Sequence, residues 1–183
     1  MRKLKISFIL IFNMLVLSSC SLVDIRLKML NEVDDEAIAN ARLEEVIEAL
    51  ENQDKDTLKA LFSKQALDES NDFDINMNQM FEFFQGEVDS WEKSSGPSAS
   101  TSNNHGHKTK QINSYYFVNT DKQKYFFLLH DNSVDTDNSD NVGLYLLLIV
   151  KAEDREKIYD ENQKILYDGD EKISRVGIYL PLK

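Results

Sequence analysis

The sequence predicts an α+β fold in which helices come first and an antiparallel sheet follows. Between residues 35 and 86, apolar residues recur at helical spacing. From residue 109 to the end, stretches rich in aromatic and β-branched residues alternate with turn formers. The 183 residues, with only two prolines and six glycines, suit one domain and show no internal repeat.

Three helices are expected before any long strand. The first spans 35–52 and carries a single apolar stripe, formed by Leu43, Val46, Ile47 and Leu50. Asp54 is expected to cap the second helix, whose inward residues are Leu58, Leu61 and Phe62. The third starts near Asp72 or Asp74 and stops at Gly86, with Met77, Met80, Phe81 and Phe84 on one face.

The second half is expected to form the sheet. Residues 88–93 predict a short strand containing Trp91, and the Ser, Asn, Gly and Pro run at 94–107 predicts a mobile loop. Strands are then expected at about 109–118, 123–130, 142–151 and 172–180. The first two of these are joined by the short turn "NTDK", which indicates antiparallel pairing. Segment 152–171 is open between a turn or two of helix and irregular chain.

The first 20 residues have the layout of a secretory signal. Arg2, Lys3 and Lys5 precede an apolar run at 6–17, which is too short to span a bilayer because a spanning helix needs about 20 apolar residues. The stretch "LSSC" at 17–20 resembles the lipobox of bacterial lipoproteins, which implies a signal peptide at 1–19 and a diacylglyceryl group on Cys20. The competing interpretation is an ordinary secreted protein. Cys20 is the only cysteine, so an internal disulfide is excluded.

On this interpretation, residues 20–33 are a lipidated tether, 34–183 are a single α+β domain, and the protein lies on the outer face of the cell membrane. The 21 basic and 32 acidic residues give a net charge of −11, which becomes −14 without the three basic residues of the leader. Nucleic-acid binding needs clustered Lys and Arg, so this charge argues against it, and against lying flat on an anionic membrane.

A second resemblance begins at "EALENQDKDTLKALFS" (48–63). This stretch looks like the opening of the nuclear-transport-factor-2-like superfamily, and the order of elements over about 35–180 is similar. The resemblance implies a cone in which N-terminal helices pack on a strongly bent antiparallel sheet. The chain is also similar to uncharacterised lipoprotein families of Gram-positive bacteria, which tend to show a Gly-Ile pair near the final strand, as in "VGIYLP" here.

Three stretches invite a chemical interpretation. His105 and His107 have alternate spacing but no third ligand nearby, so a solvated loop is favoured over a metal site. The acidic run 131–141 lacks the glycine and the bidentate glutamate of a calcium loop and is expected to be a hairpin loop. His130, beside Asp131, is the best candidate acid or base, with a strand-end polar residue as the alternative. No cofactor or metal motif is present, so no cofactor is expected.

The central strands are apolar on both faces. The second face is therefore expected to be covered by the C-terminal segment, by a sheet curling on itself, or by another molecule. Aromatic residues are the candidates for lining a pocket, with plain core as the alternative; they are Trp91, Tyr115, Phe117, Tyr125 and Tyr145.

These observations favour a binding module for a small apolar ligand, a peptide or a protein partner. The alternative is a small cone-fold enzyme, isomerase or hydrolase-like, that uses His130. A third interpretation is a subunit that dimerises through its sheet face.

Overall fold

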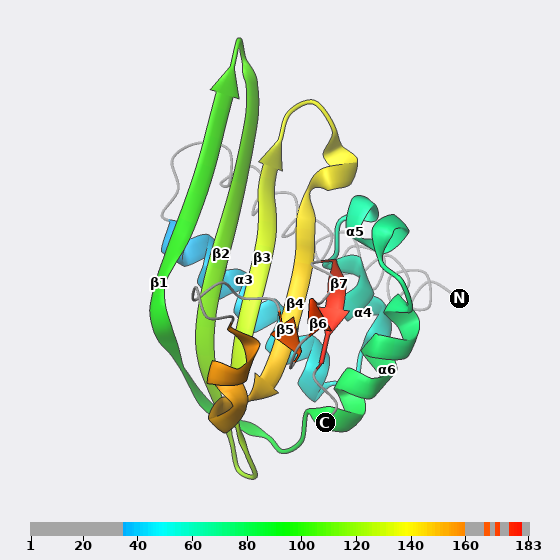
Figure 1. The fold of residues 1–183 in the computed structure, drawn as a ribbon, viewed down its shortest axis with the longest axis vertical. Helices are drawn as coiled ribbons and strands as arrows, with labels where there is room; N and C mark the ends of the chain where they lie inside the picture. The colour runs from blue at the N-terminus through cyan, green and yellow to red at the C-terminus, as the bar shows by residue number, and fades with distance from the viewer. Residues whose placement is uncertain (1–34, 160–166, 169–170, 173–175, 181–183) are drawn as a thin grey trace, which may run out of the picture. The chain divides into compact units, whose positions relative to one another are not determined.

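The computed structural model describes residues 35–159, 167–168, 171–172 and 176–180. Within them, helices come first and a five-stranded sheet follows, so the predicted α+β class is confirmed. Figure 1 shows helix α3 crossing one face of the sheet, with the shorter helices gathered beside it. The predicted leader, Cys20 and tether lie outside the described residues.

Four helices make up about the first third of the described chain. They are α3 (Asp35–Glu51), α4 (Lys55–Ala60), α5 (Lys64–Glu69) and α6 (Phe73–Phe83). The first helix matches its predicted bounds, and the Asp54 side chain caps α4 by accepting from the backbone N–H of Thr57. The prediction of three helices was wrong, because Ser63 caps the short additional helix α5 by accepting from the Ala66 N–H. Helix α6 ends before Gly86.

The sheet has the strand order β1-β2-β3-β4-β7, and its described edges do not meet. Its members are β1 (Val88–Asn104), β2 (His107–Thr120), β3 (Lys124–Asp135), β4 (Gly143–Lys151) and β7 (Gly177–Tyr179). The first three pairings are antiparallel, whereas β7 runs parallel to β4. The predicted all-antiparallel sheet was therefore wrong at its last strand.

The connection after β4 explains the parallel strand. The 3-10 helix η2 (Ala152–Ile158) begins directly after β4, and the short strands β5 (Tyr167–Asp168) and β6 (Glu171–Lys172) form a separate pair before β7. A connection of this length gives the chain room to return and enter the sheet in the same direction as β4. The predicted strand 172–180 is consequently only three residues long in the main sheet.

The predicted loop at 94–107 is a long hairpin instead. β1 continues to Asn104 and pairs with β2 up to Asn104 opposite His107, as the tall arm in Figure 1 shows. His105 and Gly106 both adopt positive φ, at 52° and 95°, which is the conformation of a two-residue hairpin turn. Gly96 and Pro97 fall within a register shift between Ser95 and Ser98. Proline has no backbone N–H to donate to a neighbouring strand, and it is tolerated at such an irregular position.

Two later boundaries also differ from prediction. β3 extends to Asp135, so part of the acidic run 131–141 is strand, and the remaining turn contains the 3-10 helix η1 (Ser139–Asn141). Segment 152–171, left open by the sequence, starts with the helical turns of η2.

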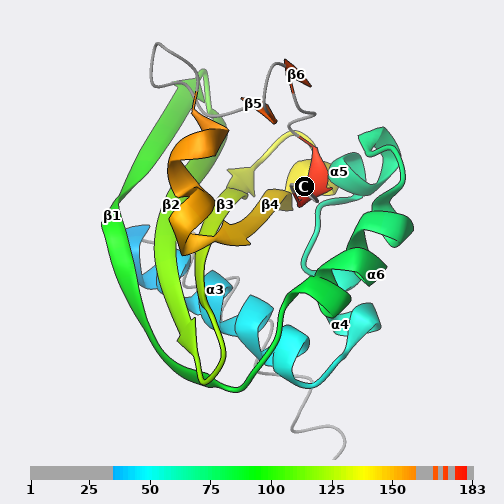
Figure 2. The same cartoon turned by 60° about the horizontal axis from the view of Figure 1, so that its bottom comes forward.

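Each face of the sheet has its own core. Tyr116, Phe127 and Leu147 are fully buried on the face that carries α3. The opposite face forms a second buried cluster, made by Phe126, Leu128, Leu146, Leu148, Val150 and Ile158. Figure 2 shows η2 lying over this second face, where Tyr159 and Tyr179 also pack. Among the coverings considered from the sequence, the C-terminal segment is therefore the one found.

Tyr116 links the sheet to α3 and gives a pH-dependent prediction. Its hydroxyl donates to Asn40 Oδ1 at 2.9 Å, and burial raises its pKa from 10 to about 12. The folded state thus keeps the Tyr116 proton at pH values above 10, where the unfolded chain loses it. The contribution of the buried, protonated hydroxyl to the free energy of unfolding is therefore fully present below pH 10 and is lost as pH rises towards 12. Tyr116→Phe should flatten this fall in the free energy of unfolding, measured by urea titration at pH 9 to 12. An unchanged pH profile would contradict this role.

Candidate functional site

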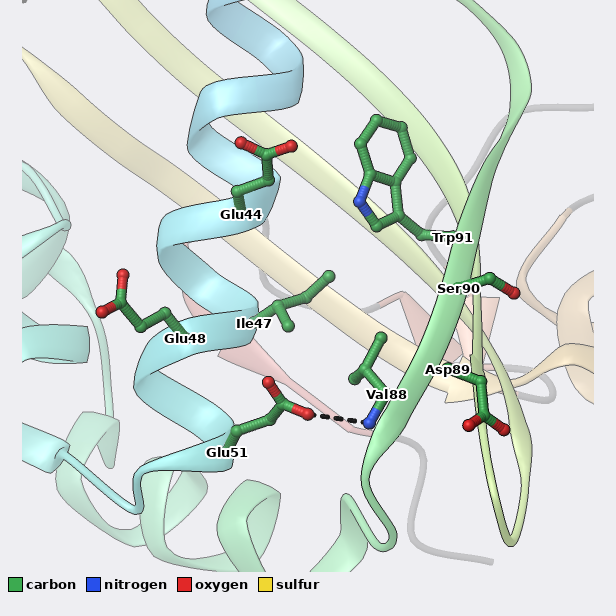
Figure 3. A pocket seen from close by; sticks show the side chains of 8 residues that line it. All are labelled: Glu44, Ile47, Glu48, Glu51, Val88, Asp89, Ser90 and Trp91. Carbon is green, nitrogen blue, oxygen red and sulfur yellow. Dashed lines mark hydrogen bonds between the residues drawn. The ribbon is translucent and has the colours of Figure 1, made fainter.

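An open groove of about 560 Å³ lies between α3 and the start of β1. Its lining comes from these two elements alone: Glu44, Ile47, Glu48 and Glu51 from α3, and Val88, Asp89, Ser90 and Trp91 from β1. Figure 3 shows Ile47, Val88 and Trp91 directed into the gap, Glu44 beside it, and Glu51 reaching across one end of it to the Val88 N–H. The groove therefore has an apolar floor and carboxylates along its margin.

Trp91 is held in a fixed position in this groove. Its indole makes an edge-to-face contact with the Tyr116 ring, with centroids 5.5 Å apart and planes at 90°. Tyr116 is itself fixed by its hydrogen bond to Asn40. Trp91 remains half-buried, so part of the indole is open to a ligand. An indole face is the side-chain surface that binds a cation best.

The carboxylates of the groove differ from the others on α3. Asp35, Glu36 and Glu45 pair with Lys110, Lys93 and Arg42 respectively. Glu44, Glu48, Glu51 and Asp89 are exposed and make no ion pair within the described part of the chain. Glu51 alone has a hydrogen bond, accepting from the Val88 N–H at 2.7 Å. The groove thus presents negative charge that no basic side chain of the described residues neutralises.

This charge arrangement comes at a local cost. Glu44 and Glu48 lie one helical turn apart, and like charges at this spacing destabilise a helix by about 0.2–0.5 kcal/mol. Sequence reasoning singled out Trp91 but missed these glutamates. The available signal was a row of three glutamates, Glu44, Glu48 and Glu51, beside the apolar stripe of α3, with no basic residue three or four positions away within the helix.

The other aromatic candidates do not line this groove. Tyr115 and Phe117 pack against Phe126 on the second face of the sheet, where the Arg155 guanidinium covers Phe117 at 5.5 Å. Tyr125 is buried between the sheet and α6. Its hydroxyl donates to the Phe83 carbonyl at 3.0 Å and accepts from the Gln85 N–H at 2.9 Å.

The last aromatic candidate, Tyr145, lies beside His130. The Tyr145 hydroxyl donates to Glu69 at 3.0 Å, and its ring centroid lies 5.3 Å from that of His130. The structure brings these two predicted residues together, but neither lines the α3–β1 groove.

His130 and Asp131 have different neighbours in the structure. Asp131 is 3% exposed and pairs with Arg42 of α3 at 3.0 Å, whereas His130 is half-buried and contacts Tyr145. Their separation follows from the alternation of side chains along a strand. An acid or base role for His130 stays a prediction that no contact described here tests.

The two histidines of the hairpin turn have different partners. His105 Nδ1 lies 2.6 Å from Asn104 Oδ1, and His107 contacts Asp137 of the β3–β4 connection. Within the described ranges, no group of three or more His, Cys, Asp or Glu side chains is placed to hold a metal ion. In the same ranges, no helix is long and apolar enough to cross a membrane.

One protein-family model matches the chain over residues 45–152, and its description is "Domain of unknown function (DUF5104)". The chain belongs to this family. The DUF5104 match runs from within α3 to the start of η2, so it covers both walls of the groove except Glu44. No curated protein matches this DUF5104 chain.

Proposed function

We propose that this protein is a membrane-anchored extracytoplasmic lipoprotein that acts as a binding module. Its ligand is a partner with basic side chains, which enters the groove between α3 and β1. The observation that carries this proposal is the combination of a fixed, partly open Trp91 with carboxylates that lack basic partners among the described residues. Of the ligand classes that the sequence leaves open, this groove favours a basic peptide or protein over a small apolar molecule.

Physical chemistry supports a cationic ligand over a neutral one. A cation over an indole contributes about 0.5–1 kcal/mol at exposed sites, and each exposed ion pair contributes about 0.2–1 kcal/mol. Each contribution is small, so several basic groups must engage the groove together. The net negative charge, −11 for the full sequence and −14 without the leader, also draws basic partners toward the molecule before contact.

We propose that the domain has a cone-like fold and belongs to the nuclear-transport-factor-2-like superfamily. Helices precede the sheet, and α3 packs across it. Three register shifts interrupt the β1–β2 pairing and favour a bent strand. The mixed open sheet with a parallel last strand departs from the all-antiparallel pattern.

We propose that lipid on Cys20 anchors the protein. Two acyl chains give lasting attachment where one would be marginal, because each buried methylene contributes about 0.8 kcal/mol. Cys20→Ser should move the protein from the membrane fraction to the aqueous fraction and abolish incorporation of labelled palmitate. Equal membrane retention of the variant would contradict the anchor. Because the binding measurement below does not depend on lipidation, it tests the groove separately.

Binding is best measured by calorimetry with an oligolysine peptide and the intact chain in detergent. The double variant Glu44→Gln/Glu48→Gln should weaken affinity about three- to tenfold, since two exposed ion pairs are lost. The matched control is Glu82→Gln on α6, an exposed carboxylate that changes the charge outside the groove. Added salt should weaken binding, because exposed charges are screened beyond about 8 Å at physiological ionic strength.

The groove proposal would be wrong in either of two cases. One is an oligolysine peptide that does not bind the wild-type chain at low salt. The other is a loss of affinity per removed charge that is the same in Glu44→Gln/Glu48→Gln as in Glu82→Gln. That result would indicate that the peptide is attracted by the net charge alone.

A further inference from the structure

Within the described residues no strand pairs with the outer edge of β1, and only the Val88 N–H at its start has a partner, the Glu51 carboxylate. β1 is the first strand in the sheet order and pairs only with β2. A terminal strand presents a row of backbone N–H and C=O groups that another strand can pair with. Edges are normally protected by lysine, proline, a bulge or a covering element.

Protection of this edge stops at Pro97. Gly96 and Pro97 lie in the register shift between Ser95 and Ser98, and Lys93 lies just before them. From Ser98 to Asn104 the strand has no proline, no register shift in its pairing with β2 and no charged residue. All of its residues from Ser98 onward are exposed.

The absence of charge here contrasts with the rest of the chain. Charged residues make up 29% of the sequence and the net charge is −11, so two copies repel each other over most of their surfaces. The uncharged segment 98–104 offers small Ser, Ala, Thr and Asn side chains, which allow close approach and hydrogen bonds across paired strands.

We infer that β1 pairs antiparallel with β1 of a second copy through residues 98–104, which joins the two sheets at their edges. Antiparallel pairing about a two-fold axis is self-complementary, because the same segment serves on both subunits. Within this segment it meets no like-charge repulsion. This interface lies along the strand edge, not on the sheet face, and is independent of the groove and of the lipid anchor.

Sedimentation of the intact chain in detergent, corrected for bound detergent, tests this pairing. The interface is small, so we expect a weak dimer whose fraction rises up to about 100 μM protein. Two double variants, Ala99→Lys/Thr101→Lys and Ala99→Glu/Thr101→Glu, should each remain monomeric because like charges meet across the axis. An equimolar mixture of the two should dimerise again.

This design separates edge pairing from general charge effects. The lysine variant lowers the net negative charge, so general repulsion alone predicts that it associates more strongly than wild type. The control Thr109→Lys adds a positive charge to β2, which is paired on both sides, and should leave the dimer intact. A wild-type chain that stays monomeric up to about 100 μM, or edge variants that dimerise like wild type, would overturn the inference.

Discussion

Replacing Arg42 with methionine should lower the free energy of unfolding by about 3–5 kcal/mol, because it leaves a buried carboxylate without its cation. Arg42 Nε donates to Asp131 Oδ2 at 3.0 Å, and the Asp131 side chain is only 5% exposed. The second oxygen of Asp131, Oδ1, is buried and accepts no hydrogen bond from the described residues. Burial alone would lower the pKa of Arg42, but the attraction of Asp131 and Glu45 outweighs it and raises this pKa.

Two further variants show whether the unpaired charge is responsible. Arg42→Met/Asp131→Leu removes both charges and should recover most of the lost stability, since a buried pair is often replaceable by apolar residues at little cost. Glu45→Gln removes the other partner of Arg42, whose side chain is 29% exposed, and should cost at most about 1 kcal/mol. Chemical denaturation measures the free energy of unfolding of Arg42→Met and of these two variants. A double variant as unstable as Arg42→Met would show that packing, not charge, is lost.

Gly143→Ala should also destabilise the fold strongly, by about 3 kcal/mol or more. Gly143 has φ of 131°, and an added Cβ would lie 2.8 Å from the Ser63 nitrogen and 2.9 Å from the Leu61 oxygen. These backbone atoms cannot move away freely. The Ser63 N–H donates to the Leu144 carbonyl, and the Leu144 N–H donates to the Leu61 carbonyl, each at 2.9 Å.

Two other glycines supply a graded control for this prediction. Gly106 has φ of 95° but no atom within 4 Å of an added Cβ, so Gly106→Ala should cost about 1 kcal/mol from backbone strain alone. Gly96 has neither a positive φ nor a close neighbour, and Gly96→Ala should change stability by less than about 0.5 kcal/mol. Thermal unfolding of the three variants should follow this order. Equal losses of stability in the three variants would exclude the contact of the added Cβ with residues 61–63 as the cause of the destabilisation by Gly143→Ala.

The helices could be predicted because their signals are local. The apolar stripe of α3 and the cap at Asp54 depend on residues within a few positions of each other. Helix α5 was missed because six residues give too little periodicity to detect, although Ser63 is a recognisable cap. The apolar second face of the central strands correctly indicated a covering element, which the described structure supplies as η2.

The long strand β1 could not be predicted from its own composition. Its Ser, Gly and Pro content favours a loop, and pairing with the neighbouring strand β2 overrides that preference. Three register shifts also disrupt the simple alternation by which strands are recognised. The parallel entry of β7 depends on the long connection after β4, whose path a hydrophobic pattern does not encode.

The groove was only partly predictable for a related reason. Its walls are 37 residues apart at the Glu51–Val88 contact, so no local spacing brings them together. Trp91 was one of five aromatic candidates for lining a pocket. Glu44 and Glu48, in contrast, look like an ordinary solvated helix face until β1 is placed beside them. The shared site becomes visible only once α3 and β1 are packed together.

The emission of Trp91 tests the central claim most directly. Trp91 is the only tryptophan in the chain, so its fluorescence reports on the α3–β1 groove and on no other site. Titration with oligolysine should produce a saturable change in emission that is weakened in Glu44→Gln/Glu48→Gln, retained in Glu82→Gln and reduced by salt. An emission spectrum that does not change while the peptide binds, or that changes equally in both variants, would contradict binding in this groove.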